Sequence, residues 1–392
     1  MSNPPHLPAA PVCASPAIEW TDPVREAAFR GWLDRIGPSQ GLSPDSLRLA
    51  SADASFRRYL RIDCAPTFDT DVSSLPPKGD VSPWGGPAAK RPHGSRIIMD
   101  APPDKEDSEP FVRVAALMAQ AGLNVPEVLD WDRAGGFMLL TDLGTRTMME
   151  VIDPAVPDAN RGLYMQAVDA LVALQLASKP GVLPAYDEAL LARELALFPD
   201  WYLAQHRGVK VEGRLGETLD ATFKLIIERN LAAPSVYVHR DFMPRNLMLP
   251  ADLQEPRLGV LDFQDAVYGP VTYDIASLMR DAFLSWDEEF VLDITVRYWQ
   301  RAQQAGLPVD PDFGEFYRAV EWMGLQRHLK VAGIFARLTL RDGKPRYLAD
   351  TPRFIAYIRA TAGRYRELTP LLRLVDEVEG IEQTAAFVFG RV

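Results

Sequence analysis

Apolar residues alternate over short stretches near the start of the chain and recur at helical spacing over most of the rest. Asp22-Pro23 is a typical helix start, and apolar residues follow it at helical spacing to Ile36. Alternating or continuous apolar runs predict strands at 46–50, 56–62, 96–100, 125–131 and 136–140, with a helix at 110–121. After residue 142 the pattern changes to long amphipathic helices. The pattern therefore predicts an α+β fold with two lobes, a small antiparallel one and a large, mainly helical one.

The predicted helices of the second lobe follow one another closely. They cover 162–177, 190–205, 215–230, 274–283, 287–304, 313–340 and 351–372. Phe198-Pro199 interrupts the second of them. Residues 65–95 are dense in proline and glycine and predict a flexible insertion. We therefore expect a disordered tail (1–17), an N-terminal lobe (18–142) and a C-terminal lobe (143–392).

Two polar loops in the C-terminal lobe predict the chemistry. The first carries His239, Asp241 and Asn246 after a short apolar strand, and the second carries Asp262 after another. Asp241 is placed to accept the proton of an attacking hydroxyl, while Asn246 and Asp262 offer the oxygen ligands that Mg²⁺ prefers. His239 is expected to orient the loop, and Arg245 either meets a phosphate or braces the loop. The spacing indicates a phosphotransferase.

Other classes of protein lack support. The chain contains no Gly-x-Ser-x-Gly elbow, no His-x-x-x-His pair and no Walker-type phosphate loop. A formal net charge of −11 argues against a nucleic-acid partner. Cys13 and Cys64 form neither a disulfide framework nor a zinc-binding spacing. The pattern contains no signal peptide and no membrane span, so we expect a cytoplasmic location. We also expect a monomer.

A resemblance to known proteins extends this interpretation. Residues 239–246, 261–265 and 269–278 resemble the aminoglycoside phosphotransferase/choline kinase superfamily, which shares the protein-kinase fold. Further segments, at 51–61, 99–103, 193–202 and 324–347, are similar to bacterial kinases of cell-wall recycling that phosphorylate the anomeric hydroxyl of N-acetylmuramate and N-acetylglucosamine.

The resemblance implies a sugar substrate, ATP and Mg²⁺. It implies that Asp241 is the base and that Asn246 and Asp262 are the metal ligands. Asp274 is then a buried brace for the catalytic loop, or alternatively a simple helix N-cap. The turn at Asp142-Leu143 is expected to offer backbone groups to adenine, so the N-terminal lobe binds the nucleotide.

The nucleotide site departs from the kinase pattern. Met99 stands on the third strand where kinases generally have a lysine, and the first turn lacks the Gly-x-Gly-x-x-Gly pattern. Arg57, Arg58 or Lys105 could replace the missing cation, and we favour one of the two arginines. The candidate nucleotide-binding residues are Ser51, Ser55, Phe56, Arg57, Arg58, Met99, Asp142 and Leu143.

Substrate residues are sought in the helical lobe. On a continuous helix, one arc of roughly 80° would contain Arg327, Lys330, Arg337 and Arg341. This arc is either a basic wall that binds the lactyl carboxylate of N-acetylmuramate or a mixed packing face. The candidate substrate residues are Arg193, Asp200, Trp201, Gln264, Asp265, Arg327, His328 and Lys330. Two alternatives stay open: an aminoglycoside or other small-alcohol kinase, and an inactive nucleotide- or sugar-binding protein.

Overall fold

The computed structural model describes residues 18–52, 56–65, 94–250 and 257–382. The predicted tail and most of the predicted insertion lie outside these residues. Contacts divide the chain into two units. The first unit consists of Met1–Ala116, Val125–Gly144 and Pro250–Pro256. The second consists of Leu117–Asn124, Thr145–Leu249 and Arg257–Val392.

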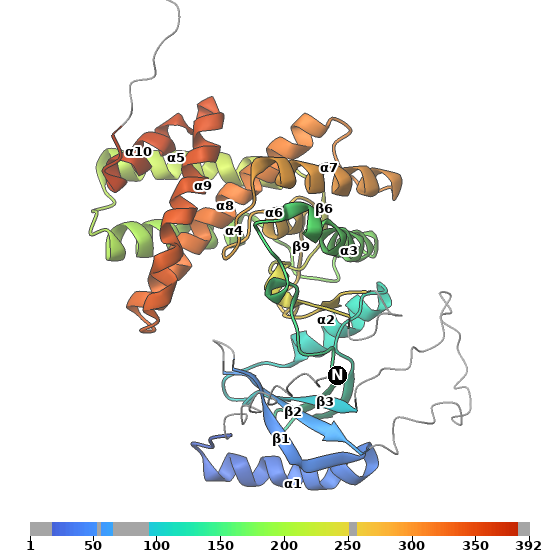
Figure 1. The fold of residues 1–392 in the computed structure, drawn as a ribbon. Coiled ribbons are helices and arrows are strands. Elements are labelled where there is room, and N and C mark those ends of the chain that lie inside the picture. The colour runs from blue at the N-terminus through green and yellow to red at the C-terminus, as the bar shows by residue number, and fades with distance from the viewer. Residues whose placement is uncertain (1–17, 53–55, 66–93, 251–256, 383–392) are drawn as a thin grey trace, which may run out of the picture. The chain divides into compact units, whose positions relative to one another are not determined.

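The first unit contains a five-stranded antiparallel sheet in the order β1-β2-β3-β5-β4. Figure 1 labels three of its strands, β1, β2 and β3, beside helix α1. Its strands are β1 (Leu42–Ala52), β2 (Arg58–Cys64), β3 (Ser95–Asp100), β4 (Val128–Asp132) and β5 (Phe137–Thr141). Helix α1 (Pro23–Gln40) begins as predicted, because the side chain of Asp22 accepts a hydrogen bond from the Val24 N–H. It ends at Gly41, whose φ of 63° suits glycine.

The two faces of this sheet differ, because side chains alternate along each strand. One face packs on α1. Its core contains Phe29, Trp32, Leu33, Ile36, Leu60, Ile62, Ile98, Phe137 and Leu139. Tyr59 and Met99 are paired across β2 and β3 one position away from Leu60 and Ile98, so they lie on the opposite face. Helix α2 (Glu109–Gln120) follows β3, and its last turn belongs to the second unit.

The second unit is mainly helical. Two short antiparallel strand pairs, β6 (Ser235–Val238) with β9 (Val267–Pro270) and β7 (Leu247–Met248) with β8 (Gly259–Val260), support its polar loops. Its α-helices are α3 (Pro157–Leu176), α4 (Glu188–Leu197), α5 (Gly213–Leu231), α6 (Tyr273–Met279), α7 (Glu288–Gln304), α8 (Phe313–Leu340), α9 (Thr351–Arg364) and α10 (Thr369–Glu379). Shorter helical turns are η3 (Met148–Glu150), η5 (Pro244–Asn246), η6 (Pro345–Asp350) and η7 (Arg366–Leu368). The predicted α+β class is confirmed.

Three predicted helices differ from those observed. At the predicted break, Phe198-Pro199, the chain stays helical but changes type, because α4 ends at Leu197 and a π-helix, η4 (Phe198–His206), begins at the next residue. The helix predicted at 274–283 is too long, because the Asp281 side chain accepts the Phe283 N–H and favours a turn after Met279. The single helix predicted at 351–372 is wrong. It divides into α9 and α10, because Pro370 is tolerated in the first turn of a helix and not in its interior.

Helix α8 is the central element of the second unit and packs against α4, α5, α6, α9 and η4. At Gly333 the helix approaches the end of α4 closely, because an added Cβ would lie 2.2 Å from the carbonyl oxygen of Leu197. The position is therefore restricted to glycine by a backbone neighbour rather than by its own dihedral angles.

We expect Gly333→Ala to lower the free energy of unfolding by about 1–3 kcal/mol, because the Leu197 backbone must move to admit the methyl group. The matched control is Gly162→Ala on α3, where nothing lies within 4 Å of an added Cβ. The control should raise the free energy of unfolding by about 0.5–1 kcal/mol through helix propensity. Urea denaturation measures both, and equal effects at the two positions would contradict the close approach.

Candidate active site

The loop after β6 is organised around His239, whose side chain is completely buried. Its Nδ1 accepts a hydrogen bond from the backbone N–H of Asp241 at 3.2 Å, so the proton resides on Nε2. Nε2 then donates to the carbonyl oxygen of Leu261 at 3.0 Å. Burial lowers the pKa of His239, which favours the neutral ring that this arrangement requires. His239 thereby joins the two polar loops.

Arg240 has a φ of 77°, a left-handed conformation that is uncommon for residues other than glycine. The peptide groups around it are held from two sides. The completely buried carboxylate of Asp274, on α6, accepts the N–H of His239 at 2.7 Å and that of Arg240 at 3.0 Å. Nη1 of Arg327, on α8, donates to the carbonyl oxygen of Arg240 at 2.8 Å. Arg240, the residue immediately before Asp241, is thus held in a strained conformation by side chains from α6 and α8.

Asp241, Asn246 and Asp262 lie close together. Asp241 is half-buried, and its carboxylate accepts no hydrogen bond from the described residues. Nδ2 of Asn246 donates to the carbonyl oxygen of Asp241 at 2.9 Å and approaches Oδ2 of Asp262 at 3.4 Å. Asp262 also has a left-handed backbone, with a φ of 63°, and its Oδ1 accepts from Gln264.

The pair Asn246 and Asp262 suits magnesium better than a transition metal. Since the Asn246 amide nitrogen is used within the loops, the amide oxygen is the group available to a cation. Over residues 18–382, apart from the stretches that the structure does not describe, no group of three or more His, Cys, Asp or Glu side chains could hold a metal ion. Two protein oxygens, completed by waters and phosphates, are the ligands that Mg²⁺ commonly uses.

A buried cluster around Glu194 adjoins the catalytic loop. Glu194 Oε1 accepts from Nη2 of Arg240 at 2.6 Å and from Nζ of Lys330 at 2.7 Å. Its Oε2 accepts from Gln326 at 3.0 Å and from the hydroxyl of Tyr186. These five residues are called the Glu194 cluster. They connect α4 and α8 to the loop that presents the candidate base.

The charge balance of the cluster shows in the pKa of Glu194. Burial alone would raise this pKa, but the cations of Lys330 and Arg240 outweigh burial and lower it to about 2. Asp274 differs, because burial outweighs its hydrogen bonds and raises its pKa. The carboxylate of Glu194 is therefore ionised at neutral pH, and it offsets part of the charge of two cations.

The candidate substrate residues occupy different places. Arg327 and Lys330 are used inside the protein, and the Arg327 guanidinium also lies 4.7 Å from the centre of the Tyr273 ring. His328 is buried on another side of α8, where its ring stacks on Tyr357. The remaining candidates have more solvent contact: Arg193, Asp200 and Asp265 are exposed, while Trp201 and Gln264 are half-buried. Their roles toward a substrate stay predictions.

Arg245 lies away from these contacts. Arg245 is exposed, and its guanidinium lies 4.8 Å from the centre of the Phe283 ring.

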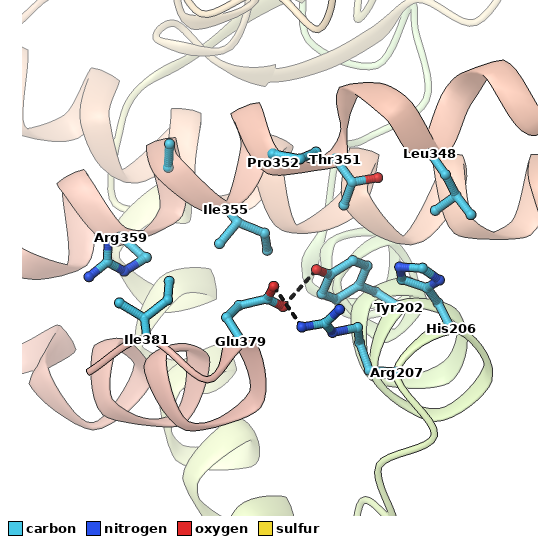
Figure 2. A pocket seen from close by; sticks show the side chains of 11 residues that line it. Tyr202, His206, Arg207, Leu348, Thr351, Pro352, Ile355, Arg359, Glu379 and Ile381 are labelled. Carbon is cyan, nitrogen blue, oxygen red and sulfur yellow. Dashed lines mark hydrogen bonds and ion pairs between the residues drawn. The ribbon is translucent and has the colours of Figure 1, made fainter. Parts of the chain in front are cut away.

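A cavity of about 350 Å³ opens between η4, α9 and the end of α10 (Figure 2). Figure 2 shows Tyr202 and Arg207 directed to Glu379, with bonds of 2.7 and 2.9 Å. None of the predicted site residues lines this cavity.

The candidate nucleotide residues lie in the first unit. The Asp142 carboxylate accepts from Arg61 at 2.6 Å, from Ser95 and from the Gly144 N–H, and these contacts overcome burial to lower its pKa. Leu143 next to it is buried. Met99 is buried in the sheet. Ser55 and the side chain of Ser51 lie outside the described residues.

Sequence reasoning did not single out Glu194 or Arg240. A signal for Glu194 is present, because Leu191, Glu194, Leu195 and Phe198 form one buried stripe of α4 and its continuation. A charged residue in an otherwise apolar stripe is rarely left without a partner. The partners themselves are far away in the sequence, so the pattern could identify the position but not the contact.

Comparison with known proteins identifies a family and similar proteins. The model of the phosphotransferase enzyme family matches residues 84–310. A Pseudomonas aeruginosa protein named N-acetylmuramate/N-acetylglucosamine kinase is 46% identical over 364 residues, which cover 91% of this chain and 97% of that protein. A Neisseria meningitidis protein of the same name is 44% identical over 360 residues, covering 92% and 97%.

Solved structures resemble this chain in fold. Plasmodium vivax ethanolamine kinase has a TM-score of 0.53 at 10% identity, with 90% of each chain covered. The GDP complex of an aminoglycoside 2′-phosphotransferase has a TM-score of 0.56 at 13% identity, covering 84% of this chain and 97% of that one. The predicted kinase-like fold is confirmed.

Among the described residues, no helix has the length and apolar character needed to cross a membrane.

We expect Glu194→Ala to lower the free energy of unfolding by about 3–5 kcal/mol, because it leaves the Arg240 and Lys330 cations without their shared carboxylate. The control is Glu188→Ala, which removes an exposed carboxylate from the first turn of the same helix and should cost no more than about 1 kcal/mol. Urea denaturation compares them, and equal losses would contradict the role of the cluster.

The Glu194 contribution should also depend on pH. Its pKa is lower in the folded protein, about 2, than its ordinary value of 4.5, so protonation favours the unfolded chain. The stabilisation is complete above pH 4.5 and is lost as the pH falls from 4.5 toward 2. The difference in unfolding free energy between the wild type and Glu194→Gln should therefore shrink over this range. A difference that stays constant would show that ionisation of Glu194 is not what stabilises the cluster.

Proposed function

Because the chain belongs to the phosphotransferase enzyme family, we propose that it is an ATP-dependent kinase that phosphorylates the anomeric hydroxyl of N-acetylmuramate and N-acetylglucosamine. The observation that carries the proposal is the similarity, over nearly the full length of both chains, to proteins named for these two sugars. The products are the sugar 1-phosphate and ADP. We further propose that the enzyme works in the cytoplasm, where ATP and the precursors of the cell wall are found. We also propose that it acts as a monomer.

Asp241 acts as the general base in this proposal. The anomeric oxygen attacks the γ-phosphorus of ATP, its proton passes to the Asp241 carboxylate, and the bond from the γ-phosphorus to the β–γ bridging oxygen breaks to release ADP. The half-buried carboxylate suits this role, because the described residues donate no hydrogen bond that would compete for its lone pairs. The held Arg240 backbone keeps Asp241 in one orientation, which reduces the entropy lost when the hydroxyl is positioned.

Asn246 and Asp262 would hold Mg²⁺. When bound, this ion offsets negative charge on the nucleotide phosphates. The protein contributes the arrangement of the ligands. Asn246 is oriented by its bond to the Asp241 backbone, and Asp262 by the side chain of Gln264. Base and ligands therefore belong to one connected set of hydrogen bonds.

The substrate lies in the second unit in this proposal. Lys330 and Arg240 share the carboxylate of Glu194 and lie beside the loop that carries Asp241. Cations at this place suit the lactyl carboxylate of N-acetylmuramate better than a polycationic aminoglycoside.

The first test is a panel of acceptors with ATP and Mg²⁺. We expect 1-phosphate formation on N-acetylmuramate and N-acetylglucosamine, followed by phosphorus NMR, and no transfer to kanamycin-like amines. Transfer to the amines alone would overturn the substrate assignment and leave the family assignment unchanged. Absence of any transfer, with ATP binding retained, would instead favour an inactive binding protein.

The second test is Asp241→Asn. We expect kcat to fall by about 10²- to 10⁴-fold, because the amide cannot accept the proton of the hydroxyl. The affinity for ATP, measured by calorimetry, should stay close to that of the wild type. The matched control is Asp220→Asn, the same chemical change at an exposed position of α5, which should leave kcat unaltered. An unchanged kcat in Asp241→Asn would exclude this residue as the base.

A further inference from the structure

We propose that Arg57, held in place by Glu106, is the cation that binds the phosphates of the nucleotide in place of the lysine that Met99 replaces. The inference rests on the proposed function, because it assigns a role within the ATP site. It also decides between Arg57, Arg58 and Lys105, which the sequence left open.

The register of the sheet separates the two arginines. Arg58 pairs with Asp100 across β2 and β3, and Tyr59 pairs with Met99. Because side chains alternate along a strand, Arg58 lies on the α1 face with Leu60 and Ile62. Arg57 is the residue before β2, and the alternation of β2 continued by one residue would place it on the face of Tyr59 and Met99. A charge that replaces a lysine at the Met99 position must come from this face, which excludes Arg58.

The contacts of Arg58 agree with its place on the α1 face. Its Nε donates to Oδ2 of Asp100 at 3.0 Å, and its guanidinium lies 4.2 Å from the centre of the Trp20 ring. Asp100 is buried and also accepts from Nε of Arg25 on α1 at 2.8 Å. Two arginines thus share one buried carboxylate in the packing between α1 and the sheet. Arg58 is part of the fold rather than of a ligand site.

Arg57 has a different partner. Its Nη2 lies 3.2 Å from Oε2 of Glu106, and the two side chains are only 10% and 16% exposed. Oε1 of Glu106 accepts from the backbone N–H of Phe56 at 3.3 Å. Glu106 therefore holds both the guanidinium and the peptide that precedes it. Glu106 precedes α2 in the chain.

The remaining cations nearby are less suitable. Arg61 shares the face of Tyr59, but its guanidinium is used by the Asp142 carboxylate and by the carbonyl oxygen of Gly144. Lys105 is exposed, and its Nζ lies 5.1 Å from the centre of the Phe56 ring.

The physical reason for the pair is preorganisation. Protein kinases hold their phosphate-binding lysine with a glutamate, so that the cation is already in place when the nucleotide arrives. An arginine presents a planar fork of N–H donors that matches phosphate oxygens. Glu106 would therefore fix the orientation of the Arg57 guanidinium before the nucleotide binds.

The test compares nucleotides with and without phosphates, by calorimetry on the full-length protein. Arg57→Ala should weaken the binding of MgATP by about 10- to 100-fold, the range for hydrogen bonds to charged groups. The affinity for adenosine should change less than about twofold. Glu106→Gln should weaken MgATP less than Arg57→Ala does, because the guanidinium stays but loses its charged partner.

Two further variants separate a phosphate contact from a structural role. Arg58→Ala should lower the melting temperature and leave the ratio of ATP to adenosine affinity unchanged, because Arg58 stabilises the sheet through Asp100. Adding Met99→Lys to Arg57→Ala should restore part of the ATP affinity by returning a cation to the same face. If this double variant does not fold, the single variants still decide.

The outcomes distinguish this inference from the proposed function. Arg57→Ala with wild-type ATP affinity, or with equal losses for ATP and adenosine, would overturn the role of Arg57 alone. A wild-type protein that binds adenosine as tightly as MgATP would overturn the kinase assignment as well. Loss confined to ATP, together with catalysis by the wild type, supports both.

Discussion

The site depends on one buried carboxylate that holds two successive peptide groups. Asp274 accepts the backbone N–H groups of His239 and Arg240, so the left-handed backbone at Arg240 persists. Left-handed conformations cost free energy at residues other than glycine and survive only where surrounding contacts demand them. Here the contacts come from α6 and α8, which frame the loop. The position of Asp241 therefore depends on the packing of helices as much as on its own sequence.

Charge balance links this loop to the rest of the second unit. Arg240 and Lys330 share Glu194, while Arg327 bonds a backbone carbonyl and lies against the Tyr273 ring. Buried cations are tolerated when carboxylates and hydrogen bonds replace water. The cluster therefore anchors the side chain of Arg240, while Asp274 and Arg327 hold its backbone.

The two units use arginine in different ways. In the first unit, Arg58 and Arg25 share the buried Asp100 and join α1 to the sheet, whereas Arg57, the residue before β2, is paired with Glu106. The loss of a lysine at Met99 is compatible with a kinase if a neighbouring position on the same face supplies the charge. Such a replacement conserves the electrostatic requirement of phosphoryl transfer without conserving the residue that meets it.

The sequence by itself determined the elements and residues that depend on near neighbours. The start of α1, the end of α4 before Phe198-Pro199 and the spacing of Asp241, Asn246 and Asp262 all arise within short segments, where capping, proline sterics and loop length act locally. Only the tertiary structure decided which face of the sheet each arginine occupies and which cations meet Glu194, 46 residues from Arg240 and 136 from Lys330. Strand register and helix packing set these contacts, because burial makes an ionic partner obligatory without specifying where in the chain it lies.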